Sequence, residues 1–182
     1  MRGTLPRAVK RWIERSYGRD GLEQVLSMLA PETAESFRVD AFNALVWHDL
    51  DPLDLLMDAA TFALLGGETK QWQRLAREHF DAELGPIFRA SARGDATTLV
   101  QRLPEKIGRV LDFGAVKPVR NGERWTLRFE GFEAASLALR YALLGTIEAT
   151  LRNAGLTEAT VKILSGEASF ARDLEIELTQ KV

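Results

Sequence analysis

The stretch VKPVRNGERWTLRFE, residues 116–130, decides the fold class because the spacing of apolar residues changes there. Upstream of it, apolar residues recur every three to four positions, as on one face of a helix. Within it, Trp125, Leu127 and Phe129 alternate with polar and charged residues, which predicts a strand with one buried face. The sequence therefore predicts a helical part first and a sheet after it.

The dipeptide Asn121-Gly122 in the middle of this stretch is typical of a two-residue β-hairpin loop. We expect this loop to pair Arg120 with Glu123, which places two antiparallel strands side by side. The apolar residues of both strands then share one face of the sheet.

Downstream of the hairpin, the pattern predicts a long helix over 134–154, followed by strands over 160–164 and 170–178. Together with the hairpin, these segments form a strand-strand-helix-strand-strand unit. We therefore expect a small four-stranded antiparallel sheet in residues 115–182.

The first part of the chain predicts a layer of helices. We expect helices over 5–17, 21–29, 32–47, 52–65 and 68–88, and two short ones that are split by Pro104 and end at Gly114. The helix over 52–65 is apolar almost all round, so we expect it to be the central buried one. The predicted fold is α+β in one domain, residues 1–182, with an N-terminal helical layer (1–114) packed on a C-terminal ββαββ unit (115–182).

Composition narrows the classes of function. The net charge of −2 argues against a general attraction to nucleic acid. The chain has no cysteine, which excludes disulfides, thiolate zinc sites and cysteine nucleophiles. No apolar run approaches the roughly 20 residues of a membrane helix, and no signal segment opens the sequence, so we expect a cytoplasmic protein without a membrane span.

Short motifs spread along the chain resemble a known group. They are Arg2-Gly3-Thr4, Tyr17-Gly18, Trp47 before Pro52, Leu84-Gly85-Pro86, Arg102-Leu103-Pro104, Asp112-Phe113-Gly114, Gly145, Gly155 and Ser165-Gly166-Glu167. On these motifs the chain resembles an uncharacterised paralogous family from myxobacteria. That family is in turn similar to the superfamily of heme nitric-oxide-binding domains, vinyl-reductase-type ligand-binding domains and TRAPP vesicle-tethering subunits.

This resemblance implies a helical layer on a small antiparallel sheet, often dimeric, with a cavity between helices and sheet. Heme members use an axial histidine on a helix just before the sheet and a Tyr-x-Ser-x-Arg pattern. Residues 95–114 contain no histidine, and Leu139-Arg140-Tyr141-Ala142 departs from that pattern. Zinc-holding members use cysteines near the C-terminus, which this chain lacks. We therefore expect neither heme nor another cofactor.

Eight residues are candidates for lining a ligand pocket: Trp47, His48, Asp58, His79, Glu83, Trp125, Arg140 and Tyr141. Pockets are mostly apolar with a few polar groups, which tryptophan beside histidine or arginine can supply. The four tryptophans, including Trp12 and Trp72, are most simply anchors of a hydrophobic core.

His79 and Glu83 lie one helical turn apart, as a general base and its orienting carboxylate would. The alternative is a histidine at the edge of the core with an ordinary helical ion pair. The spacing alone does not separate these two interpretations.

Asp54, Asp58 and Thr61 form a polar stripe on the helix over 52–65. The stripe is either a polar anchor in a pocket, with Arg74 or Arg140 as its partner, or a surface that faces water. We favour the water-facing interpretation because lone buried aspartates are rare.

One cluster has possible metal ligands, namely His48, Asp49, Asp51 and Asp54. However, we expect Asp51 to be the N-cap of the helix that begins at Pro52, and Asp54 to complement the helix dipole. No metal site is therefore predicted.

Three hypotheses follow. The first is a non-enzymatic sensory module that binds a small, apolar ligand without heme. The second is a protein–protein interaction module that acts as a homodimer or with another protein. The third, ranked last, is an enzyme that uses His79 and Glu83.

Overall fold

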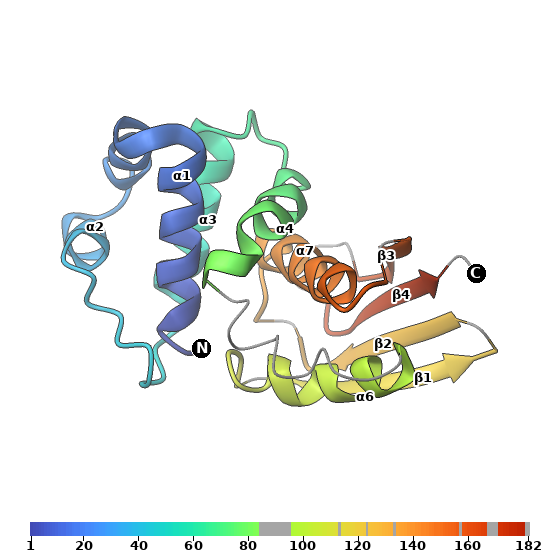
Figure 1. Cartoon of the computed structure of the whole chain (residues 1–182). Helices are drawn as coiled ribbons and strands as arrows, with labels where there is room; N and C mark the ends of the chain where they lie inside the picture. Colours follow the sequence, from blue (N-terminus) through green and yellow to red (C-terminus); the bar gives the residue numbers. More distant parts are fainter. Residues whose placement is uncertain are drawn as a thin grey trace.

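The computed structural model describes residues 1–83, 96–112, 114–122, 124–132, 134–156, 158–166 and 171–180, with the backbone alone at 80–83, 96 and 180. The helices are α1 (Thr4–Leu26), α2 (Pro31–Arg38), α3 (Asp51–Ala63), α4 (Gln71–Glu83), α6 (Ala96–Ile107) and α7 (Leu137–Asn153). The strands are β1 (Ala115–Asn121), β2 (Arg124–Glu130), β3 (Ala159–Ser165) and β4 (Leu174–Gln180). This order, with α7 between two pairs of strands, confirms the predicted α+β class (Figure 1).

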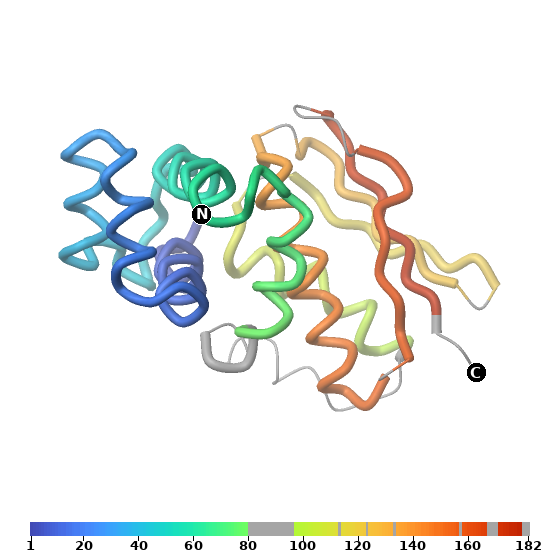
Figure 2. Tube along the Cα trace, turned by 90° about the horizontal axis from the view of Figure 1, so that it is seen from above, coloured from blue at the N-terminus to red at the C-terminus, as the bar shows by residue number. Residues whose placement is uncertain are grey.

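The four strands form one antiparallel sheet in the order β1-β2-β4-β3. Alternation along the two central strands buries their inward side chains: Leu127, Phe129, Leu174, Ile176 and Leu178. Helices α4, α6 and α7 lie on one side of the sheet (Figure 2). The outer face carries cross-strand ion pairs, such as Arg128 with Glu175 at 2.9 Å.

The hairpin of β1 and β2 forms as predicted, but in a different register. Arg120 pairs with Trp125 rather than with Glu123, and Asn121 pairs with Arg124. The expectation was wrong because Asn121 extends β1 instead of opening the loop. Since side chains alternate with a period of two, this shift by two residues keeps the same residues on the buried face.

The central buried helix is α7, not the helix over 52–65 as expected. Every residue from Ala138 to Leu151 is buried. The polar residues of α7 made this helix look only partly buried in the sequence. Some of them form hydrogen bonds within the helix, since the hydroxyls of Thr146 and Thr150 each donate to the carbonyl one turn earlier, at 2.9 and 2.7 Å. The helix over 52–65 corresponds to α3, which exposes part of its apolar surface.

Helices α4 and α7 touch closely at Gly145. A Cβ atom at Gly145 would overlap the carbonyl oxygen of Gln73 and lie 3.0 Å from the Cβ of Ala76. Beside this contact, the buried carboxylate of Glu148 accepts hydrogen bonds from Arg77 at 3.2 Å and from Gln73 at 3.3 Å. The absence of a side chain at Gly145 therefore sets the distance between the two helices.

Several helix boundaries differ from the predicted ones. At Gly18 the prediction is confirmed, because this residue, with φ of +74°, is non-helical and separates two helical segments within α1. Helix α2 ends at Arg38, so the predicted helix over 32–47 was wrong in its second half. Pro104 lies inside α6 without splitting it. Asp51 is the first residue of α3 and not its N-cap.

Two further boundaries are not settled by the structure. The predicted helix end at residue 88 and the predicted strand start at residue 170 lie outside the described residues. Among the helices that are described, none has both the length and the apolar character needed to cross a bilayer.

Replacing Gly145 by alanine tests the α4–α7 contact. Because the new methyl group overlaps backbone rather than a flexible side chain, we expect Gly145→Ala to lower the free energy of unfolding by at least about 2 kcal/mol. Urea titration measures this loss. The control is Gly108→Ala, whose Cβ has its nearest neighbour at 3.4 Å and should change stability by less than about 1 kcal/mol. Equal effects of both variants would contradict the contact.

Candidate functional site

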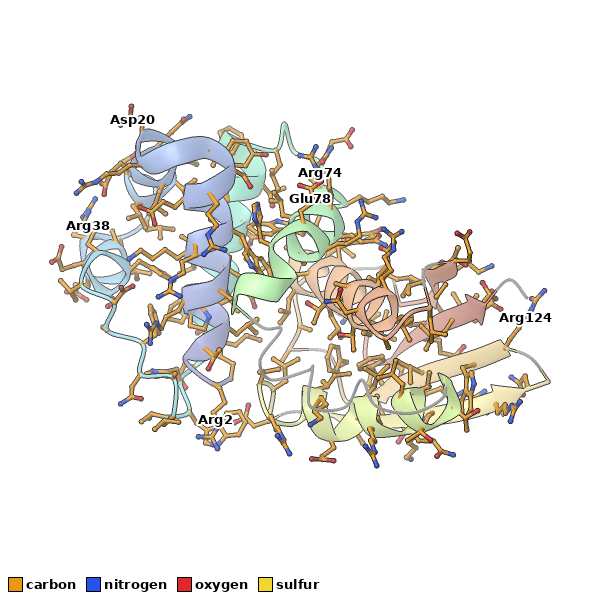
Figure 3. All side chains as sticks on the ribbon, viewed as in Figure 1. Arg2, Asp20, Arg38, Arg74, Glu78 and Arg124 are labelled. Carbon is orange, nitrogen blue, oxygen red and sulfur yellow. The ribbon has the colours of Figure 1, made fainter. Side chains whose placement is uncertain are left out.

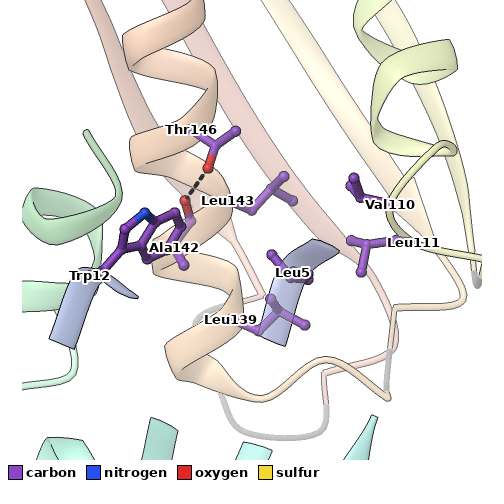
Figure 4. A pocket seen from close by; sticks show the side chains of 8 residues that line it. All are labelled: Leu5, Trp12, Val110, Leu111, Leu139, Ala142, Leu143 and Thr146. Carbon is purple, nitrogen blue, oxygen red and sulfur yellow. Dashed lines mark hydrogen bonds between the residues drawn. The ribbon is translucent and has the colours of Figure 1, made fainter. Parts of the chain in front are cut away.

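A small apolar cavity lies between α1, the segment after α6, and α7. Its lining residues are Leu5, Trp12, Val110, Leu111, Leu139, Ala142, Leu143 and Thr146 (Figure 4). The cavity volume is about 20 Å³, which is enough for about one water-sized probe. In this form the cavity therefore accommodates only a very small molecule.

Helical periodicity brings these side chains together. Leu5 and Trp12 are seven residues apart and share one face of α1, and the four residues from α7 follow an i, i+3, i+4, i+7 spacing. The hydroxyl of Thr146 donates to the carbonyl of Ala142 at 2.9 Å, so it is already satisfied. The segment after α6, which contributes Val110 and Leu111, is held to the start of the chain, because Arg2 N–H donates to the Val110 carbonyl at 2.8 Å.

Trp12, one of the lining residues, carries an unusual polar group. Its side chain is fully buried, and its indole Nε1–H has no hydrogen-bond partner within the described part of the chain. Trp72, by contrast, donates its indole N–H to Thr61 Oγ1 at 2.8 Å. A buried donor without a partner costs about 1–3 kcal/mol, and such a group calls for a specific explanation.

Of the eight residues predicted to line a pocket, the seven with described side chains are not among the residues that line this cavity. Trp47 is 39% exposed, and the guanidinium of Arg2 lies over its ring at 4.3 Å. Trp125 is half-buried on β2, with Arg120 over its ring at 5.7 Å. Tyr141 is buried on α7 but is not among the lining residues.

The two histidines each have a local partner. His79 on α4 is half-buried, and its Nε2 lies 2.8 Å from Ser16 Oγ on α1. Burial lowers the pKa of His79. The charge of Glu78 raises this pKa, and the charge of Arg15 lowers it further. His48 packs edge-on against Phe42. The side chain of Glu83, the predicted partner of His79, lies outside the described residues.

Arg140 is completely buried and binds backbone carbonyls instead of a carboxylate. Its guanidinium donates to the carbonyls of Ala135 and Phe132 at 3.0 and 2.9 Å, and to those of Gly166 and Ala171 at 2.6 Å each. Burial lowers the pKa of Arg140, yet an arginine stays protonated in proteins. The residue therefore ties the start of α7 to the connection between β3 and β4.

The polar stripe of α3 divides into three different environments. Thr61 accepts from Trp72 and donates to the Met57 carbonyl at 2.7 Å. Asp58 is exposed. Asp54 is half-buried, and its Oδ1 is buried without a partner among the described residues. Neither predicted arginine partner serves here, because Arg140 binds carbonyls and Arg74 projects outward from α4 (Figure 3).

Burial raises the pKa of Asp54 to about 6. A hydrogen bond with Ser136 opposes the rise, and the charges of Asp58 and Asp51 add to it. Burial also raises the pKa of Asp58. These carboxylates are therefore close to one another without a neutralising cation in the described part of the chain.

A metal site does not form from the described residues. No group of three or more histidine, aspartate or glutamate side chains among them is arranged to hold a metal ion. This includes the cluster of His48, Asp49, Asp51 and Asp54, all of which are described.

Sequence reasoning assigned Trp12 to the core and missed its unpaired N–H. The only signal in the sequence is the seven-residue spacing of Leu5 and Trp12, which any buried helix face shares. Whether an indole finds a partner depends on residues far along the chain, so no local pattern reports it.

Comparison with known proteins identifies the fold. No family model matches this sequence, and no curated protein is significantly similar to it. A doubly substituted Tt H-NOX superposes with a TM-score of 0.70 at 15% identity, covering 100% of this chain and 96% of that chain. A mutant of Cs H-NOX that carries 4-cyano-L-phenylalanine superposes with a TM-score of 0.71 at 15% identity, covering 100% of this chain and 97% of that chain. The chain has the H-NOX fold.

A third structure agrees with this. An oxygen-binding H-NOX domain related to soluble guanylate cyclases, in its oxygen complex, gives a TM-score of 0.64 at 13% identity, with 100% of this chain and 96% of that chain covered. The likeness to the heme nitric-oxide-binding superfamily that the sequence motifs implied is thus confirmed for the fold. At this identity the likeness shows the fold alone, and the chemistry of the cavity depends on the residues that line it.

Arg140 should be essential for stability. We expect Arg140→Met to lower the free energy of unfolding by about 3–5 kcal/mol, because several buried carbonyls lose their donor at once. The free energy of unfolding of Arg140→Lys should lie between those of Arg140→Met and the wild type. Urea titration measures the loss, and Arg74→Met at an exposed position is the control. A loss below about 1 kcal/mol would contradict the role assigned to Arg140.

Asp54 should destabilise the protein at neutral pH. Its folded-state pKa of about 6 lies above the usual 3.8, so the wild type should lose stability as the pH rises from about 4 to about 6. We expect Asp54→Asn to raise the free energy of unfolding by about 1–2 kcal/mol at pH 7.5 and to leave it almost unchanged near pH 4. The measurement is urea unfolding across this pH range.

Asp20→Asn, at an exposed carboxylate of α1, is the matched control and should leave the pH dependence unchanged (Figure 3). A gain that is independent of pH in Asp54→Asn would mean that burial of the charge is not its cause.

Proposed function

We propose that this protein is a non-enzymatic sensory module that binds a small apolar ligand and works without heme. The observation that carries the proposal is an apolar cavity within an H-NOX fold. One of its lining residues, Trp12, also has a buried indole N–H without a partner among the described residues. A ligand with one acceptor atom would complete the hydrogen bonding of Trp12 and fill the cavity.

The residues present do not fit a heme. Iron in a heme needs an axial ligand such as histidine, and the chain has two histidines. Neither lines the cavity: His79 is bonded to Ser16, and His48 packs on Phe42. The cavity of about 20 Å³ is also far below the roughly 300–1,000 Å³ of pockets for drug-sized ligands.

The cavity chemistry indicates the class of ligand. Its walls are aliphatic and aromatic, and the one hydroxyl among the lining residues is already used within α7. A very small apolar molecule with an acceptor atom matches both the size and the polarity of the cavity. An ionic ligand would lose its hydration without gaining a partner.

An enzymatic role has less support. His79 shares its hydrogen bond with Ser16 across the α1–α4 contact, which fits a structural link between the helices. His79 is not among the residues that line the cavity.

A partner-binding role is our second candidate, acting beside ligand binding. Several large apolar side chains are exposed, and among the described helical residues Phe62 is the most exposed of these, at 77%. We also propose, from the sequence motifs and composition, kinship with the myxobacterial paralogues and a cytoplasmic location.

Xenon, a single apolar atom, is a suitable probe of the cavity. We expect xenon to bind near Leu143 and Trp12, seen as localised shifts in methyl and indole signals by NMR. Leu143→Ala should enlarge the cavity, cost about 2–4 kcal/mol of stability and increase xenon uptake. Leu53→Ala, buried on α3 away from the cavity, should cost a similar amount without this gain.

Hemin titration tests the heme-free part of the proposal. When hemin is added, we expect no Soret band of a heme bound through histidine. A stoichiometric heme complex whose spectrum changes in His79→Ala or His48→Ala would contradict it, and absence of any xenon effect at the lining residues would contradict the ligand site.

A further inference from the structure

Helix α3 carries an exposed stripe that is unusual in its composition. Asp51, Leu55, Asp58 and Phe62 follow one another at intervals of four, three and four residues, which places them on one face of the helix. All four are exposed, with Leu55 at 49% and Phe62 at 77%. This spacing is that of a helix–helix seam in a coiled coil.

The buried side of the same helix explains why the stripe faces outward. Leu53, Leu56, Met57 and Ala60 point into the core, where α3 packs against α1 and α7. The helix is thus fixed by its core side, and Leu55 and Phe62 leave 49% and 77% of their surfaces exposed.

The charges along the stripe are also unmatched. No basic side chain within the described residues forms an ion pair with Asp51, Asp54 or Asp58. Asp54, at the edge of the stripe, has a buried Oδ1 without a partner. Burial and mutual repulsion raise the pKa of Asp54, so a cation placed here would relieve an existing cost.

A second copy of the same helix does not fit this stripe. Antiparallel pairing would set Asp51 against Phe62 and Leu55 against Asp58, which buries carboxylates against apolar groups. Parallel pairing would set aspartate against aspartate. A different helix, with basic residues alternating with apolar ones at the same intervals, satisfies both the carboxylates and the apolar side chains.

We propose that the stripe of Asp51, Leu55, Asp58 and Phe62 docks a basic amphipathic helix of a partner protein. The apolar residues of the partner pack on Leu55 and Phe62, and its lysines or arginines pair with the aspartates. The inference rests on the second candidate role and shares no residue with the cavity. About three helical turns of contact make a small interface, so the expected affinity is micromolar.

The test uses a labelled synthetic helix of about 18 residues made of leucine, lysine and alanine, with leucine and lysine alternating at seam positions. Fluorescence anisotropy should give a micromolar Kd that weakens as salt is raised from about 50 to 300 mM. Phe62→Ala and Asp58→Asn should each weaken binding by about tenfold, and Asp58→Asn should also reduce the salt dependence.

Matched controls lie away from the stripe. Leu164→Ala on β3 removes another exposed apolar side chain, and Asp20→Asn removes another exposed carboxylate. Neither should change the Kd. A peptide with glutamate in place of lysine should not bind, and circular dichroism checks that every variant keeps its helices.

Four outcomes would overturn the proposal. They are no binding of the lysine peptide at millimolar concentration, equal binding of the glutamate peptide, equal weakening by the control variants, and a homodimer in light scattering that Phe62→Ala dissociates. None of these results bears on xenon binding at Trp12, so the two proposals fail independently.

Discussion

The close contact of α4 with α7 at Gly145 is the constraint on which the arrangement of layers depends. Because α7 has no side chain there, the backbone of α4 can approach it, and α7 is enclosed between α4 and the sheet. Once enclosed, α7 must satisfy its own polar groups, which it does through bonds within the helix and through Glu148 and Arg140. One face of α7 then supplies half of the residues that line the cavity.

Helix α1 connects the two regions to which we assign functions. Through Leu5 and Trp12 it forms one wall of the cavity, and along its length it packs on α3, whose outer face carries the acidic and apolar stripe. The cavity and the stripe are therefore separated by one helix. A ligand that displaced α1 would act on the helix that presents the stripe, which is a direct physical route between them.

The sequence predicted the features that depend on local pattern. The change of period near residue 116 located the sheet, and the alternation around Leu127 identified its buried face correctly despite the wrong hairpin register. Features that depend on distant contacts were not predictable. Helix α7 looked mixed because its polar residues find partners inside the fold, and α3 looked central because exposed Leu55 and Phe62 resemble core residues.

The same reasoning explains the candidate site. Trp47, His48 and His79 were selected by residue type, yet each is engaged with a neighbour outside the cavity. The cavity is lined by ordinary aliphatic residues, and what distinguishes it is a missing hydrogen bond at Trp12. A missing partner is a property of the assembled structure and leaves no trace in a pattern of residues.

The carbonyl contacts of Arg140 have a consequence for local motion. Gly166 and Ala171 are 26 and 31 residues away from Arg140 in sequence, so the end of β3 and the approach to β4 are attached to a buried cation. If these strands frayed alone, a charge would be left in the interior without its acceptors. Their amide hydrogens should accordingly exchange through the opening of the whole core, as one cooperative unit with the first turn of α7.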